Sequence, residues 1–67
     1  MIYKLLKHNG DSYSRLTRSK KACFNYFNKL NWGNINKLCI YTDEWHLERV
    51  VGGYYTIYEY LKDNGVN

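Results

Sequence analysis

The chain lacks several features by which the class of a small protein can be recognised directly. Its 67 residues contain no proline and only two cysteines, and no apolar run approaches the roughly 20 residues that span a membrane. The first eight residues lack the long apolar core of a signal peptide, so we expect a cytoplasmic protein. In a reducing cytoplasm Cys23 and Cys39 remain thiols, and we therefore expect no disulfide framework.

Acidic residues are scarce in the first half of the chain. Residues 1–30 carry seven Lys or Arg and one Asp, whereas residues 31–67 carry three Lys or Arg and five Asp or Glu. The net charges of the two halves are therefore +6 and −2. A basic half of this kind favours an anionic partner or head-to-tail self-association, while ordinary solvated surface charge is the simpler interpretation.

Aromatic residues, by contrast, are abundant. Eight residues are tyrosine and 45% of the chain is hydrophobic, which is typical of a folded globular protein. A chain of this length forms one domain, residues 1–67, and buries only about 60% of its unfolded surface. More large rings are present than so small a core easily holds, which indicates a surface that contacts a partner.

The first half predicts a hairpin followed by a helix. Asn9-Gly10 is a strong two-residue turn signal, and the β-compatible segments 2–8 and 12–17 flank it. Ser19 is the best N-cap for a helix that runs to about Trp32 and ends at Gly33.

The second half predicts three strands. Residues 36–42 form the first, and Gly52-Gly53 joins residues 45–51 to residues 54–60 in a second hairpin. The register of this hairpin directs four large side chains inward: Trp45, Leu47, Tyr58 and Tyr60. We thus predict an α+β fold of order ββαβββ, one antiparallel sheet packed by one helix. The alternative makes residues 54–62 a helix, because Tyr54, Ile57, Tyr58 and Leu61 fit helical spacing; we favour the strand because Tyr, Thr and Ile are β-prone.

Catalytic and metal-binding patterns are weak. His46 lies opposite Glu59 in the expected hairpin, but no serine or cysteine is directed at this pair, so we predict a protein that is not an enzyme. The four possible metal ligands include no pair separated by two to four residues, as structural zinc sites usually have. We therefore predict neither metal nor cofactor. These four residues are His8, Cys23, Cys39 and His46.

Two candidate binding surfaces follow from these patterns. The first is basic and aromatic and suits an anionic partner such as RNA or single-stranded DNA, because bases stack on rings while Lys and Arg pair with phosphates. Its residues are Lys4, Tyr13, Arg15, Arg18, Lys20, Lys21 and Phe24. The second has an apolar centre with a polar rim, as protein interfaces do. Its residues are His46, Glu48, Val50, Tyr55, Ile57 and Glu59.

The whole pattern resembles small phage and mobile-element accessory proteins of the anti-CRISPR type. The resemblance lies in the Asn-Gly hairpin, the segment Thr17-Arg18-Ser19-Lys20-Lys21-Ala22 that opens a helix, the short strands that follow, and the frequent use of amino acids with A/T-rich codons. It implies a cytoplasmic inhibitor in a bacterial host that occludes a defence or regulatory protein complex. Many such inhibitors mimic acidic nucleic acid, and this basic chain departs from them. The alternatives are a nucleic-acid-binding module and a homo-oligomer that sequesters a small anionic ligand.

Overall fold

Strands and helices follow one another in the order βαββα. The structure, a computed structural model, describes residues 1–30 and 32–65. Its elements are β1 (Ile2–Lys7), α1 (Lys20–Lys29), the short 3₁₀ helix η1 (Trp32–Asn34), β2 (Ile35–Tyr41), β3 (Leu47–Gly52) and α2 (Tyr54–Gly65). The predicted α+β class is confirmed, whereas the predicted order ββαβββ is wrong.

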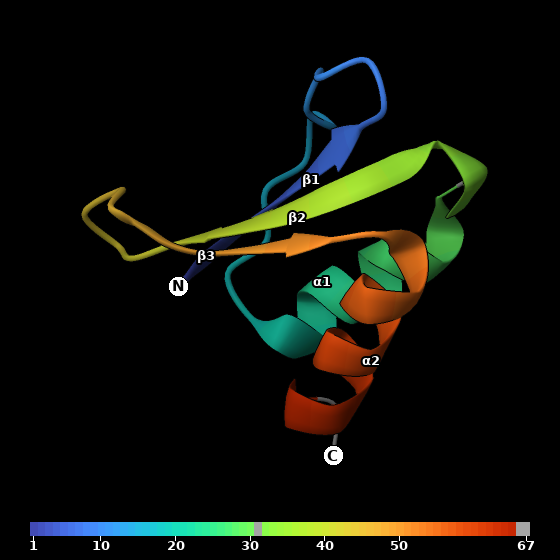
Figure 1. Cartoon of the computed structure of the whole chain (residues 1–67). Coiled ribbons are helices and arrows are strands. Elements are labelled where there is room, and N and C mark those ends of the chain that lie inside the picture. Colours follow the sequence, from blue (N-terminus) through green and yellow to red (C-terminus); the bar gives the residue numbers. More distant parts are fainter. Residues whose placement is uncertain (31, 66–67) are drawn as a thin grey trace.

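The three strands form one antiparallel sheet in the order β1-β2-β3. Both helices cover the same face of this sheet, and the other face carries no helix among the described residues (Figure 1). The core lies between the helices and the sheet. Its fully buried side chains include Leu5, Leu38, Phe27, Ile57 and Leu61.

Helix α1 begins where the sequence predicts. Ser19 has extended backbone angles, and its hydroxyl accepts a hydrogen bond from the Ala22 N–H at 3.1 Å. Cys23 and Phe27, one turn apart, enter the core. The helix ends at Lys29, earlier than predicted. The Leu30 N–H donates to the Phe27 carbonyl, three residues back, and the backbone of Leu30 is extended. Gly33 lies in η1 instead, and position 31 is outside the described residues.

The predicted strand 12–17 is absent. The Lys7 N–H donates to the Asp11 carbonyl at 2.8 Å, so the loop at Asn9-Gly10 has three residues rather than two. After this loop the chain follows β1 through two isolated bridges, Leu6 with Ser12 and Tyr3 with Thr17. The segment therefore covers the outer edge of β1 without forming a continuous fourth strand.

The predicted Gly52-Gly53 hairpin is also wrong, and the alternative helix is present as α2. A type I′ turn needs positive φ at both central residues, but only Gly53 of this pair has it, at 87°. The Gly53 carbonyl instead accepts the Ile57 N–H at 3.0 Å and starts the helix. Ile57 and Leu61, four residues apart, then reach the core, and this packing outweighs the β propensity of the tyrosines.

Candidate binding surfaces

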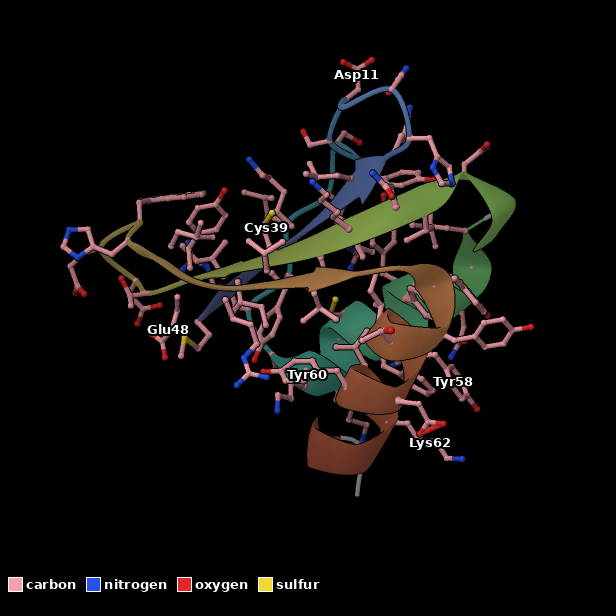
Figure 2. The ribbon with its side chains drawn as sticks, in the orientation of Figure 1. Asp11, Cys39, Glu48, Tyr58, Tyr60 and Lys62 are labelled. Atoms are coloured by element: carbon pink, nitrogen blue, oxygen red, sulfur yellow. The ribbon has the colours of Figure 1, made fainter. Side chains whose placement is uncertain are left out.

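The uncovered face of the sheet carries two rows of mainly apolar side chains that cross all three strands. Ile2, Tyr41 and Leu47 form one row, and Lys4, Cys39 and Val50 form the next. Figure 2 shows Cys39 on the side of the sheet away from the helices and Tyr60 on the helix side. We name as the open-face patch the five residues Cys39, Tyr41, Trp45, Leu47 and Val50.

Three members of the open-face patch are large apolar side chains that face solvent. Trp45 is 52% exposed, Leu47 56% and Val50 49%. Trp45 also contacts Tyr41, with ring centres 5.5 Å apart. Monomeric proteins seldom expose contiguous apolar side chains of this size, and such patches mark sites of interaction.

A β-bulge places Leu47 in the open-face patch. The register pairs Ile40 with Arg49 but Tyr41 with Leu47, so Glu48 is an extra residue in β3. One extra residue reverses the side to which the preceding side chains point. The prediction that Trp45 and Leu47 face the helices is wrong for this reason. Figure 2 shows Glu48 on the opposite side of β3 from Cys39.

Trp45 has an unusual backbone conformation. The β2–β3 turn closes when the Trp45 N–H donates to the Thr42 carbonyl at 2.9 Å, and the Thr42 N–H donates to the His46 carbonyl. Trp45 occupies the left-handed position of this three-residue loop, with φ 66°. Glycine or asparagine is usual there, and a bulky residue costs of order 1–3 kcal/mol. The turn thus presents a strained, exposed tryptophan.

The outer edge of β3 is open for pairing. The Gly53 N–H donates to the Asn36 carbonyl at 2.8 Å. This hydrogen bond shows which residues of β3 direct their backbone groups toward β2. By the alternation of an antiparallel ladder, the N–H and C=O of Val50 point the other way. No strand of the described residues pairs with this edge. A free edge with exposed apolar side chains can accept another strand.

The charges that the strands place beside the open-face patch are positive. Lys4 and Lys37 alternate with core-facing neighbours and therefore lie on the uncovered face. The Lys4 ammonium is 5.3 Å from the centre of the Tyr41 ring. On the described strands, no carboxylate occupies the register positions of this face. The patch is therefore suited to an apolar segment with acidic residues beside it.

Most cations of this protein stand over aromatic rings rather than beside carboxylates. Among the described side chains, the one ion pair joins the N-terminal amino group to Asp43 at 3.1 Å. Six Lys or Arg groups instead lie 4.2–5.6 Å from a tyrosine ring centre. A ring holds a cation without neutralising it, so these charges still attract anions.

A cleft lies between α1 and the segment that precedes it. Its volume is about 220 Å³, and it is lined by Arg15, Ala22, Asn25, Tyr26 and Lys29. The Arg15 guanidinium lies 5.6 Å from the centre of the Tyr26 ring. The edge-to-face contact of Tyr26 with Tyr13 spans 6.4 Å, and Lys7 stands over Tyr13 at 5.2 Å.

The predicted anionic surface is divided in the structure. Arg15 lines the cleft and Tyr13 contacts the Tyr26 ring, but Lys4 is on the open face of the sheet. Lys20 stands over Tyr60, Phe24 packs on Tyr58 and the core, and Arg18 and Lys21 are exposed at the start of α1. Sequence reasoning missed Lys7, Tyr26 and Lys29. The signal for two of them was the spacing of Ala22, Asn25, Tyr26 and Lys29 along one side of the helix.

The predicted protein-binding surface is divided as well. Ile57 is fully buried, so its assignment to the surface is wrong. Tyr55 and Glu59 are exposed on α2, where Tyr55 is 75% exposed. His46 and Glu48 are exposed in or near the β2–β3 turn, and Val50 belongs to the open-face patch. The missed residues are Trp45 and Leu47, and no sequence signal revealed the bulge that turns them outward.

The two cysteines are buried on different faces of the sheet. Burial raises the pKa of the Cys23 thiol to about 11, and the nearby Thr17 hydroxyl, which has no regular hydrogen-bond partner, offsets only part of this. Cys39 is a free thiol on the open face. Within the described residues, no three His, Cys, Asp or Glu side chains lie close enough to share a metal ion.

Fold and surfaces together define a small α+β protein with one face of its sheet uncovered. Comparison with protein-family models, curated proteins and solved structures finds no match for the chain. In residues 1–30 and 32–65, neither helix is long and apolar enough to cross a membrane.

Proposed function

We propose that this chain is a non-enzymatic binding protein that blocks a surface of a partner protein, as phage-encoded inhibitors of bacterial defence complexes do. The observation that carries the proposal is the strained turn, which holds Trp45 exposed at φ 66°. Backbone strain persists where it serves a function, and tryptophan is the residue most enriched at binding hot spots.

The partner contributes an extended segment that pairs with β3. Its backbone adds to the open edge at Val50, and its apolar side chains pack on Trp45, Leu47 and Val50. Acidic residues beside that segment meet Lys4 and Lys37, the two lysines that the register places on the uncovered face. Main-chain pairing of this kind supplies affinity, and the side chains beside it supply specificity.

Capture from a nuclease-treated bacterial lysate, followed by binding to the purified partner, tests this proposal. We compare wild type with Val50→Asp, and the matched control is Tyr55→Asp, which places the same charge at an exposed site on α2. We expect one partner that wild type and Tyr55→Asp retain and Val50→Asp loses. Equal retention by both variants, or no partner at all, would contradict the proposal.

The inhibitory role is tested in cells. Phage plaques are counted on a CRISPR-active bacterium that expresses wild type, Val50→Asp or Tyr55→Asp. We expect wild type and Tyr55→Asp to restore plaque formation and Val50→Asp to fail. If all three leave plaque counts at the level of the empty vector although wild type captures a protein partner, the chain blocks a different kind of protein.

A further inference from the structure

The cleft on α1 combines two cations, an amide and a ring. Ala22, Asn25, Tyr26 and Lys29 occupy positions i, i+3, i+4 and i+7 of α1, so they share one side of the helix. Arg15 comes from the segment that precedes the helix and lies over Tyr26. The small Ala22 side chain leaves room between its larger neighbours.

The charge of the cleft is uncompensated. Its lining holds Arg15 and Lys29 and no carboxylate. Helix α1 contains no acidic residue. Lys7 stands over Tyr13, the neighbour of Tyr26, and adds a third cation beside the cleft. Burial, and then the nearby Tyr26, raises the pKa of Tyr13, so its hydroxyl stays neutral near pH 7. Clefts lined by one sign of charge concentrate ligands of the opposite sign.

The ring of Tyr26 is held in place before any ligand arrives. Tyr13 meets it at an interplanar angle of 89°, and Arg15 is the side chain that stands over it. Exposed arginine side chains rearrange easily, so a flat ligand can enter between the guanidinium and the ring. Bases stack on tyrosine faces and on guanidinium planes alike.

The size of the cleft limits its ligand. Drug-sized ligands occupy pockets of roughly 300–1,000 Å³. The cleft of about 220 Å³ is smaller, so the largest ligand that it suits is a single nucleotide. A longer ligand would extend along the helix toward Lys21, which precedes Asn25 by one turn.

We propose that this cleft binds one nucleotide, with its phosphate between Arg15 and Lys29, its base on Tyr26 and its edge near the Asn25 amide. The nucleotide is either free or part of a single strand, since both present the same chemistry. The cleft and the open-face patch share no residue, so this proposal stands independently of protein inhibition.

Two-dimensional NMR and fluorescence anisotropy identify the ligand. The ¹⁵N-labelled protein is titrated with inorganic phosphate, AMP, UMP, a short single-stranded RNA and a duplex of the same sequence. We expect amide shifts at Ala22, Asn25 and Tyr26 with the nucleotides or the single strand, and weaker shifts with phosphate. Saturation by AMP or UMP identifies a free nucleotide, and saturation by the single strand alone identifies nucleic acid. Phosphate that binds as tightly as the nucleotides, or a preference for the duplex, would overturn the proposal.

Matched variants separate this site from general basicity. Tyr26→Leu should weaken binding by about 5- to 150-fold, whereas Tyr26→Phe keeps the ring and should bind as wild type does. For a single strand, Arg15→Gln with Lys29→Gln should reduce the salt slope by about 0.7, because the one phosphate held between these two side chains is no longer neutralised. The control, Lys37→Gln with Lys62→Gln, removes the same charge elsewhere and should leave affinity and slope unchanged. Equal weakening by the two double variants, or no binding by the folded wild type, refutes the site.

Discussion

Lys20 of α1 stands over the ring of Tyr60 in α2, with its ammonium 4.2 Å from the ring centre. Two lysines in the first turn of α1 oppose the helix dipole, and that turn contains no acidic residue. The ring provides Lys20 with a favourable partner that also joins the two helices. Arg49 of β3 approaches the same ring at 5.3 Å, so three elements meet at Tyr60.

This contact should be measurable as a coupling energy. A double-mutant cycle of Lys20→Met and Tyr60→Leu is expected to give about 0.5–1 kcal/mol in the free energy of unfolding by urea. The control cycle replaces Lys20→Met with Lys21→Met, which relieves the same dipole repulsion but stands over no ring among the described residues. Equal coupling in the two cycles would show that the Lys20–Tyr60 contact contributes nothing specific.

The N-cap of α1 predicts a second stability effect. Ser19→Ala removes the hydroxyl that accepts the Ala22 N–H and should lower the free energy of unfolding by about 1 kcal/mol. The control is Ser14→Ala, an exposed serine in the segment before the helix. Urea denaturation monitored by circular dichroism measures both. A loss that is no greater for Ser19→Ala than for Ser14→Ala contradicts the assignment of the cap.

The buried Cys23 thiol predicts a dependence of stability on pH. Burial raises its pKa from an ordinary value of 9.0 to about 11 in the folded protein. The unfolded chain therefore loses this proton first, and the free energy of unfolding should fall as pH rises between these two values, by about 2 kcal/mol. Well below pH 9.0 both states hold the proton and the effect is absent.

Cys23→Ala provides the control for this dependence. Tyr3 and Tyr13 also have raised pKa values through burial and add a loss of stability at high pH in both proteins. The difference between wild type and Cys23→Ala therefore isolates the thiol. Urea unfolding across this pH range should show a shallower decline for the variant. Parallel declines would mean that Cys23 titrates alike in the folded and unfolded chains.

Local signals explain how much of the fold the sequence predicts. Ser19 and the helical spacing of Cys23 and Phe27 act within α1, and the structure has a helix there. The predicted strand 36–42 agrees with β2 to within one residue at each end. Such elements are set by neighbouring residues, so they are visible without knowledge of the tertiary contacts.

Other elements depend on contacts that no local pattern contains. Tyr54–Tyr60 is β-prone, but Ile57 and Leu61 bury fully only when the segment is helical. The bulge at Glu48 turns the Leu47 side chain to the uncovered face. That face is therefore apolar rather than polar. The candidate protein-binding surface was therefore predicted at Val50 but missed at Trp45 and Leu47. The predicted anionic surface includes Arg15 of the cleft but none of the α1 residues that line it.

Trp45 separates a binding role from a structural role. Trp45→Asn places at φ 66° a residue that tolerates this conformation, and it gives up the contact with Tyr41. Relief of about 1–3 kcal/mol of strain offsets the loss of about 0.5–1.5 kcal/mol of ring contact, so stability should be unchanged or higher. Capture of the partner should nevertheless be lost. A variant that is clearly less stable would show that Trp45 supports the fold of the turn.

The adjacent glycines predict opposite responses to the same substitution. Gly53 has φ 87°, a conformation in which alanine is strained, and its carbonyl and N–H bind Ile57 and Asn36. Gly53→Ala should therefore lower the free energy of unfolding by about 1–2 kcal/mol. Gly52 lacks a positive φ, and no atom lies within 4 Å of an added Cβ. Gly52→Ala should be neutral or stabilise by up to about 1 kcal/mol, because it restricts the unfolded chain. Denaturation of the two variants in parallel tests the strand-to-helix junction directly, since a type I′ hairpin turn at this position would make both substitutions destabilising.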